Sequence, residues 1–191
     1  MMGLCLTRLD DIELGHDVCK TGTYMPDGEG TNAKILDACC GGRMFWFDKD
    51  RSDVIFMDNR RVDKTLCDGR TFIVDPDIVA DFRDIPYPDG TFSLVVFDPP
   101  HLLNGGESSW LVTKYGKLDK GWKEYILDGF SECMRVLKED GVLIFKWSET
   151  DIKVSEIRNI LPIQPLIGDR RSKTIWMVFM KGVEELSEAV A

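Results

Sequence analysis

A chain of 191 residues, 43% of them hydrophobic, is long enough for one domain with a substantial core. Its 24 Lys and Arg against 33 Asp and Glu give a net charge of −9, which argues against a protein that holds long nucleic acid by itself. No apolar run approaches the roughly 20 residues of a membrane span, and the acidic N-terminus lacks a signal-peptide layout. We therefore expect a cytoplasmic protein that does not engage a membrane.

The ends of the chain carry no convincing hydrophobic period. Residues 1–33 become rich in Gly, Asp and Thr, and we expect an irregular N-terminal arm there, with a frayed tail at 183–191. Neither half of the chain is of low complexity, so residues 1–191 are expected to form a single domain. The six cysteines include no Cys-x-x-Cys pair, which favours reduced thiols over a disulfide framework or a zinc site. We expect no bound metal.

The first two predicted strands each end in an acid. Residues 34–39 form a short apolar strand, which breaks at Cys39 into the small-residue turn that ends at Gly42. Such a turn lets the backbone of an open α/β sheet approach a ligand. A second strand, 54–58, ends in Asp58 about 20 residues beyond Asp37, the spacing at which nucleotide-binding folds present a carboxylate to ribose. Each signal alone is weak, because a strand-terminal Asp is often only a solvated end. Few residues separate the strands, so the first crossover helix must be short.

The next strands are predicted at 77–81 and 92–98. The second runs directly into Asp98-Pro99-Pro100-His101. Two prolines fix the backbone and remove two amide donors, which leaves the Asp98 carboxylate and the nearby carbonyls as a rigid set of acceptors. Such a set suits an amino group, although an Asp-Pro-Pro taken alone can equally be a rigid turn.

Residues 101–120 are predicted to form a flexible substrate loop or lid. The segment is polar and glycine-rich, yet it carries Trp110 and Tyr115, whose rings would either stack on a planar substrate or pin the loop to the body. Helices are predicted at 121–138 and 151–161, and strands at 142–147 and 174–180. The last strand follows a turn at 168–172 and is expected to be one arm of a hairpin.

Taken together, these motifs resemble the class I S-adenosylmethionine-dependent methyltransferases. In that family one strand ends in an acidic glycine motif, a second ends in an acid, and a third segment matches Asp81 to Asp89 here, followed by a strand like 92–98. The helix and strand from Glu132 to Phe145 also match, so the resemblance covers about residues 34–181. It implies an α/β, Rossmann-like methyltransferase domain, with a mostly parallel twisted sheet and an antiparallel C-terminal hairpin strand.

Within that family, Asp-Pro-Pro before an aromatic residue marks enzymes that methylate amino nitrogens, chiefly adenine N6 and cytosine N4. This chain departs from the pattern twice. His101 stands where Tyr, Phe or Trp is usual, which puts the target base in doubt. Arg43 stands where a third glycine is expected, which suggests a modified grip on the methionine end of the cofactor.

The resemblance implies S-adenosyl-L-methionine as the cofactor and assigns roles to particular residues. Those expected to bind the cofactor are Asp37, Ala38, Cys39, Gly41, Asp58, Asp81, Phe82 and Asp98. Within this set, Asp58 would bind the ribose, and Asp81 the adenine amino group. The expected catalytic residues are Asp98, Pro99, Pro100 and His101, and those expected to contact the substrate are His101, Trp110, Tyr115 and Lys146. His101 would either stack on a base or hydrogen-bond to it, and Lys146 could be only a surface lysine.

The acceptor that the resemblance favours is a nucleobase in DNA or RNA. The net charge keeps other acceptors open, namely a small molecule or a protein side-chain amide, and also a non-catalytic partner subunit that binds the cofactor. The net negative charge does not exclude nucleic acid, because positive charge is concentrated locally. Lysines recur every third residue at Lys114, Lys117, Lys120 and Lys123. These lysines could equally be solvated surface charge.

Overall fold

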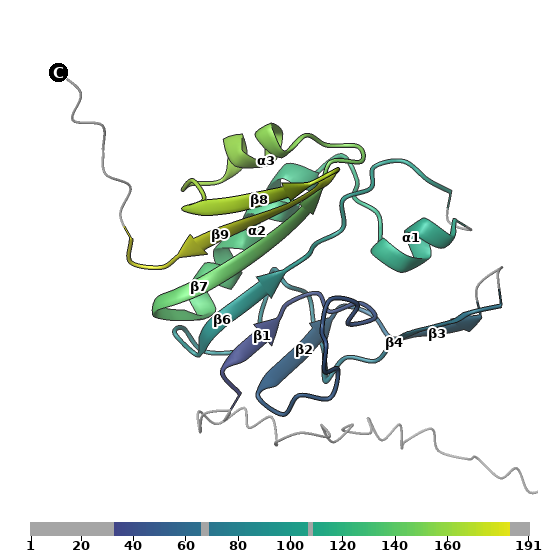
Figure 1. Cartoon of the computed structure of the whole chain (residues 1–191), viewed down its shortest axis with the longest axis horizontal. Helices are drawn as coiled ribbons and strands as arrows, with labels where there is room; N and C mark the ends of the chain where they lie inside the picture. Colours follow the sequence, from purple (N-terminus) through teal and green to yellow (C-terminus); the bar gives the residue numbers. More distant parts are fainter. Residues whose placement is uncertain (1–32, 66–68, 107–108, 184–191) are drawn as a thin grey trace, which may run out of the picture.

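The structure is a computed structural model that describes residues 33–65, 69–106 and 109–183. Its main element is a seven-stranded sheet in the order β5-β2-β1-β6-β7-β9-β8 (Figure 1). The strands are β1 (Ile35–Asp37), β2 (Val54–Asp58), β5 (Ile78–Val79), β6 (Phe92–Phe97), β7 (Leu137–Ser148), β8 (Ile167–Arg171) and β9 (Thr174–Met180). A separate hairpin pairs β3 (Val62–Thr65) with β4 (Thr71–Val74).

Five strands of the main sheet pair with one another in parallel, and the last two join the sheet through antiparallel pairs. In chain order the parallel strands are β1, β2, β5, β6 and β7, and the sheet runs outward from β1 in both directions. This is the arrangement of a Rossmann-like sheet, with its topological switch point between β1 and β6. β9 pairs antiparallel with both β7 and β8. The expected α/β class, mostly parallel sheet and antiparallel C-terminal hairpin are confirmed.

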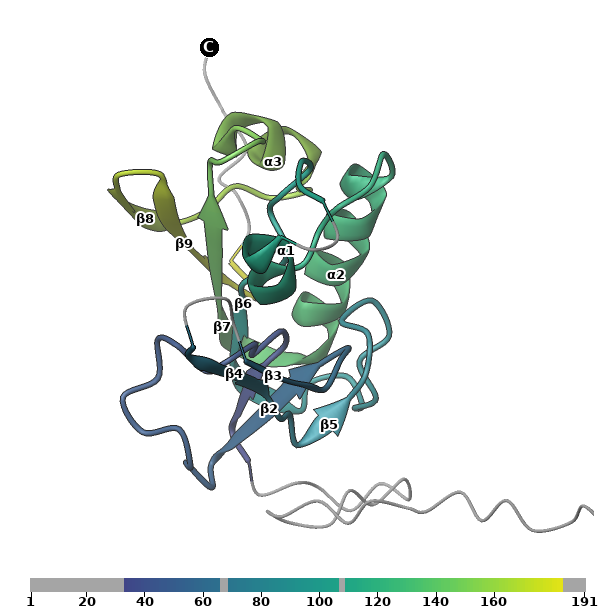
Figure 2. The same ribbon diagram turned by 90° about the vertical axis from the view of Figure 1, so that its right-hand side faces the viewer.

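Helices cover one face of this sheet. α2 (Trp122–Val136) packs against β6 and β7 and touches α3 (Val154–Ile160), and Figure 2 shows both helices on the same side of β7. Alternate side chains of β7 enter this layer, including the fully buried Phe145 and Trp147. On the opposite face a smaller cluster forms around Val54 and Phe56. No helix within the described ranges is long and apolar enough to cross a membrane.

Most expected elements lie where the sequence places them. The strands at 54–58 and 174–180 are confirmed at both ends, and the helix expected at 121–138 is α2. The hairpin turn was placed too early, because β8 occupies 167–171 and the turn falls at Ser172, whose φ is 58°. The arm at 1–33 lies outside the described residues apart from Ala33, and the tail at 183–191 apart from Val183.

Two connections differ from expectation. The short crossover helix predicted between β1 and β2 is wrong, since residues 38–53 form only turns and irregular backbone. Gly41 and Arg43 there have φ values of 49° and 53°, which a right-handed helix does not accommodate. Between β2 and β5 the chain forms the β3–β4 hairpin, which the sequence analysis missed. The expected loop at 101–120 contains a helix, α1 (Trp110–Tyr115).

We predict that Gly129→Ala destabilises the fold through overpacking. A Cβ at Gly129 of α2 would lie 2.4 Å from the Phe82 ring and 2.9 Å from the Phe97 ring. Because both rings are buried, the expected loss of unfolding free energy is about 1–3 kcal/mol, despite the better helix propensity of alanine. Urea denaturation measures it, and the exposed neighbour Asp128→Ala is the control. Equal stability of the two variants would show that α2 can shift away from the rings.

Candidate active site

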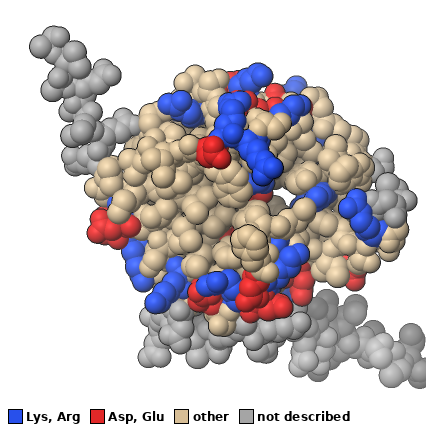
Figure 3. All heavy atoms as spheres, viewed as in Figure 1, with Lys and Arg blue, Asp and Glu red and all other residues tan. Residues whose placement is uncertain are grey.

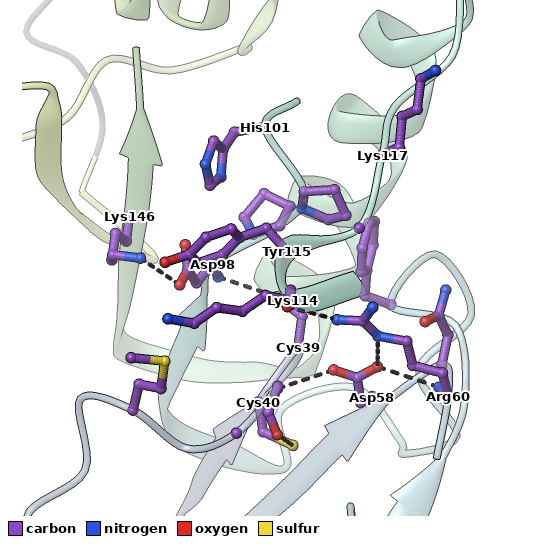
Figure 4. A pocket seen from close by; sticks show the side chains of 18 of the residues that line it. Cys39, Cys40, Asp58, Arg60, Asp98, His101, Lys114, Tyr115, Lys117 and Lys146 are labelled. Carbon is purple, nitrogen blue, oxygen red and sulfur yellow. Dashed lines mark hydrogen bonds and ion pairs between the residues drawn. The ribbon is translucent and has the colours of Figure 1, made fainter. Parts of the chain in front are cut away.

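A cavity of about 520 Å³ opens at the carboxyl ends of β1, β2, β6 and β7. This is the sheet edge at which open α/β folds bind ligands, and the cavity lies at the switch point. Its wall includes Asp58 at the end of β2, Asp98 after β6 and Lys146 of β7, and residues of α1 line the remaining side (Figure 4). The sequence-predicted residues that it brings together are Cys39, Gly41, Asp58, Phe82, Asp98, Pro99, Pro100, His101, Tyr115 and Lys146.

Asp98 forms a half-buried ion pair in the lining of this cavity. The Lys146 ammonium donates a hydrogen bond to Asp98 Oδ2 at 2.5 Å, and the two side chains are only 18% and 16% exposed. The Asp98 backbone N–H donates to Cys39 Sγ at 3.1 Å, which ties the end of β6 to the turn after β1. Burial raises the pKa of Asp98, while the positive charge of Lys146 acts in the opposite direction.

Aromatic rings flank the ammonium group of Lys146. Its Nζ lies 5.7 Å from the centre of the Phe45 ring and 5.9 Å from that of Trp176. Cations at this distance are attracted to ring faces. The two rings come from the turn after β1 and from β9, so Lys146 is held by segments far apart in the sequence. The sequence analysis missed Phe45 and Trp176.

Asp58 is held at the opposite wall by three donors, one of which is the Arg60 backbone N–H, 3.2 Å from Oδ1. The Gly41 backbone N–H donates to Asp58 Oδ2 at 3.0 Å, and Arg60 Nε donates to Oδ1 at 3.3 Å. The same guanidinium donates to the carbonyls of Thr113 and Lys114, at 2.8 Å and 3.0 Å. Arg60 therefore links Asp58 to α1. The sequence held a signal for this residue, because an arginine two positions after a strand-terminal acid can return to that acid.

His101 is enclosed by rings instead of standing free at the turn. It is 6% exposed, and its ring centre lies 5.3 Å from that of Tyr115 and 6.3 Å from that of Trp147. Burial lowers the pKa of His101, so the imidazole is neutral near pH 7. The imidazole also hydrogen-bonds with the backbone of Pro99. One face of the Asp-Pro-Pro turn is thus packed with aromatic groups.

A second aromatic wall lies near the end of β5. Phe82 and Tyr125 meet edge to face with ring centres 4.8 Å apart, and both line the cavity. Burial raises the pKa of Tyr125 to about 12, which keeps its hydroxyl protonated. Asp81, in contrast, is not part of the lining. Its carboxylate accepts hydrogen bonds from Arg83, the shorter of them 2.7 Å, and its expected contact with the cofactor stays a prediction.

Asp37 and Ala38 stand at the end of β1, just before the turn that lines the cavity. Both are buried, and the Ala38 backbone N–H is used in a 2.9 Å bond to the Val96 carbonyl. The Trp46 indole N–H donates to Asp37 Oδ2 at 2.7 Å. Burial raises the pKa of Asp37 to about 7, although the indole bond opposes the shift. Neither residue lines the cavity, so any effect that they have on a ligand passes through the turn above them.

Arg43 does not reach the cavity. It adopts the left-handed backbone conformation that the missing glycine would adopt, with φ of 53°. Its guanidinium donates to the Asp75 carbonyl at 2.8 Å and lies 3.9 Å from the centre of the Phe56 ring. These contacts direct the side chain toward the β4 side of the turn, and the modified grip on the methionine end that Arg43 suggests stays a prediction.

Trp110 and Tyr115 lie on different sides of α1. Five residues along a helix correspond to a rotation of about 140° from the starting direction, so the two rings cannot face the same site. Tyr115 lines the cavity, whereas Trp110 lines a neighbouring groove. Trp110 therefore lies outside the cavity, and its expected contact with the substrate stays a prediction.

The cysteines near the site are free thiols. Cys39, Cys40 and Cys133 form no disulfide, and burial raises the pKa of all three. A protonated thiol is a poor nucleophile, which argues against covalent chemistry at Cys39. Within residues 33–65, 69–106 and 109–183, no group of three His, Cys, Asp or Glu side chains is placed to hold a metal ion. Cys5, Cys19 and Cys67 lie outside these ranges.

Comparisons with known proteins do not identify an activity for this chain. No protein-family model matches the sequence, and no curated protein matches it. A similar solved structure is that of a Haemophilus influenzae protein described as "putative methylase HI0767". It is 12% identical, with a TM-score of 0.44, and the match covers 79% of this chain and 88% of that one. A likeness this distant assigns no activity.

We predict that Asp37→Asn changes how stability depends on pH. The folded protein holds the Asp37 proton up to about pH 7, whereas the unfolded chain releases it near 3.8. The folded state therefore binds the extra proton between these values, and stability falls as pH rises, by at most about 1.4 kcal/mol per pH unit. Above about pH 8 the folded protein has also released the Asp37 proton, so this residue no longer makes the unfolding free energy depend on pH. Asparagine has no such proton, and its amide oxygen can still accept from Trp46.

Urea denaturation between pH 5 and 9 tests this prediction. The unfolding free energy of Asp37→Asn minus that of the wild type should rise with pH and level off above the Asp37 pKa. Asp50→Asn, an exposed acid on the same connection, is the control. A difference that is constant over this range would show that Asp37 keeps an ordinary pKa.

We also predict that Arg60→Ala loosens α1. The Arg60 guanidinium donates to two carbonyls at the carboxyl end of this short helix, where backbone acceptors lack helical partners. Amide hydrogen exchange over residues 110–116 should become faster in the variant. Arg61→Ala is a matched control, because Arg61 pairs with Asp75 at 2.6 Å and makes no bond to α1. Equal exchange rates in the two variants would contradict the prediction.

Proposed function

We propose that the chain is an S-adenosylmethionine-dependent methyltransferase that transfers a methyl group to an exocyclic amino nitrogen of a nucleobase, adenine N6 or cytosine N4. The observation that carries this proposal is the Asp98-Pro99-Pro100 turn, which stands at the switch-point edge of the sheet and lines the same cavity as Asp58. A rigid acceptor set and a second carboxylate thus face one space. The acceptor would be DNA or RNA.

The cavity suits a nucleoside-bearing cofactor. Its volume of about 520 Å³ lies within the range of small-molecule and cofactor sites, roughly 300–1,000 Å³. Asp58 offers a buried carboxylate for ribose hydroxyls, and Phe82 offers an apolar ring for the base. Open space surrounds the position of a Cβ at Gly41, so the turn leaves room for a ligand there. When bound, the cofactor supplies a methyl group made electrophilic by its sulfonium centre.

The chain's own residues would orient the acceptor. Asp98 Oδ2 is occupied by Lys146, so Oδ1 and the Pro99 carbonyl would accept the two N–H groups of the amine. Neither Pro99 nor Pro100 has an amide hydrogen, and this edge therefore favours a donor group over an acceptor. Holding the nitrogen lone pair toward the methyl group lowers the barrier through alignment and electrostatics. The N–C bond would form as the methyl–sulfur bond breaks, with that electron pair left on the sulfur, and the nitrogen would release one proton to the Asp98 carboxylate.

Ring faces would hold the planar part of the acceptor. Tyr115 of α1 reaches into the cavity beside Asp98 and Lys146 (Figure 4). His101 lies behind it, neutral and packed between Tyr115 and Trp147, so it would support the stacking ring more than bond the base. A base within a duplex would have to leave the stack to enter this cavity.

Asp58→Ala and Asp98→Ala should separate binding from transfer. Removing Asp58 takes away charge-assisted hydrogen bonds and should weaken cofactor binding about tenfold to a hundredfold. Asp98→Ala should leave that affinity nearly unchanged and lower turnover about a hundredfold or more, because its partner is the acceptor nitrogen. Calorimetry with S-adenosylhomocysteine and a radiolabelled methyl assay give the two readouts. Turnover at the wild-type rate in Asp98→Ala would remove Asp98 from the mechanism.

The acceptor itself is tested by incubating the protein with labelled cofactor and separate pools of DNA, RNA, protein and metabolites. Digestion to nucleosides followed by mass spectrometry should locate the methyl group on adenine N6 or cytosine N4. Label on a base carbon, a ribose oxygen, a protein residue or a small metabolite, with none on an exocyclic amine, would show that the acceptor is wrong. Absence of cofactor binding to the wild type would overturn the whole proposal.

A further inference from the structure

A second groove, of about 470 Å³, adjoins the candidate active site. The two spaces share lining residues, among them Gly42, Met44, Phe72 and Lys114. The walls of the groove are the turn after β1, the β3–β4 hairpin and α1. Two of these, the hairpin and the helix, are the elements that the sequence did not predict, and they place the groove directly beside the cavity.

The groove is basic although the chain is acidic. Arg43, Lys49, Arg70 and Lys114 line it against a single acid, Asp75. Over the cavity and the groove together, the lining has seven Lys or Arg side chains and three Asp, whereas the whole chain has a net charge of −9. Figure 3 shows Lys and Arg side chains flanking the hollow on this face of the molecule. Positive charge is therefore concentrated where a polyanion would lie.

Lys114 is the cation best placed to meet a ligand. It is common to both spaces, and Figure 4 shows its side chain extending across the cavity. Its nearest aromatic contact is the ring of Tyr115, 5.0 Å from the ammonium. Among the described residues no carboxylate lies within ion-pair distance of it. A phosphate at the junction would find this charge available.

Exposed apolar groups accompany the charges. Trp110, the first residue of α1, is 44% exposed, and Ile73 of β4 is 52% exposed across the groove. Trp110 and Lys114 are four residues apart on one helix, so both project from the same side of α1. A partly exposed indole beside an ammonium is the combination that single-stranded nucleic acid uses, with a base on the ring and a phosphate at the cation.

We propose that this groove binds the nucleotides next to the target base, so that the substrate is a single strand of nucleic acid and not a free nucleoside. Trp110 stacks on a neighbouring base, and Lys114 contacts the phosphate between that base and the target. The inference rests on the proposed function, since it assumes that the target base occupies the adjoining cavity. Arg60 holds α1 to Asp58 and thereby fixes both side chains relative to the site of transfer.

Fluorescence anisotropy with labelled twelve-residue oligoadenylates, one of DNA and one of RNA, tests the binding step in the presence of S-adenosylhomocysteine. Trp110→Ala should weaken binding about 5- to 100-fold and leave the salt dependence unchanged, because stacking involves no counterion release. Lys114→Ala should reduce the slope of log K against log salt by about 0.7 to 1. Lys138→Ala, an exposed lysine at the start of β7, is the control.

Trp110→Phe guards against a purely structural effect of the alanine variant. A phenyl ring can still stack, so it should restore most of the affinity. If Trp110→Phe binds as poorly as Trp110→Ala, or if both lysine variants give the same salt slope, the groove is not the strand-binding site. The stronger binding of the DNA or the RNA oligonucleotide identifies the kind of strand.

Methyl transfer to a twelve-residue oligonucleotide and to the matching nucleoside 5′-monophosphate distinguishes this inference from the proposed function. We expect kcat/KM to be higher for the oligonucleotide, and Trp110→Ala to lower it more for the oligonucleotide than for the monophosphate. Equal kcat/KM for the two acceptors would overturn the inference while the proposed function stands. Transfer to neither acceptor, with label on protein or metabolites, would overturn both.

Discussion

The arrangement of the candidate site depends on the ion pair between Asp98 and Lys146. It joins the ends of β6 and β7, two adjacent parallel strands, and its ammonium is also enclosed by rings from the turn after β1 and from β9. Removing one partner of such a pair leaves a charge in a poorly solvated place, which is far more costly than removing both. The contact therefore fixes the direction of the Asp98 carboxylate and leaves one of its oxygens for a ligand.

The other walls of the site are formed by short connections between the strands. Connections that form helices in larger Rossmann-like domains are here a turn between β1 and β2 and a short hairpin between β2 and β5. Arg43 stabilises the turn from outside by bonding to the Asp75 carbonyl after β4. The same segments then border the cavity and the groove, so they serve the site as well as the sheet.

Elements determined by local pattern were predictable, and those determined by distant partners were not. β2 and β9 are apolar runs with clear boundaries, and α2 has a regular helical period, so their sequences alone define them. β3 has mostly exposed side chains and no alternation, and it is defined by its antiparallel pairing with β4, which its own sequence does not indicate.

The candidate site divides in the same way. Asp58 and Asp98 follow from their strand ends, because strand ends are local features. The partners of Lys146 and the separation of Trp110 from Tyr115 required the tertiary structure, since the polar, glycine-rich sequence around α1 is typical of a loop. Asp81 lies two residues beyond β5, which ends at Val79, and the nearby Arg83 pairs with its carboxylate.

The hydrogen bonds of Arg60 couple ligand binding at one wall of the cavity to ligand binding at the other. Its guanidinium is shared between Asp58 in one wall of the cavity and the last turn of α1 in the other. A ligand that binds Asp58 and displaces Arg60 changes the hydrogen bonds from Arg60 to α1. A ligand that stabilises α1 in turn changes the strength of the Arg60–Asp58 contact. By linkage these two effects must be equal in free energy, so the two ends of the cavity respond to their ligands as one coupled unit.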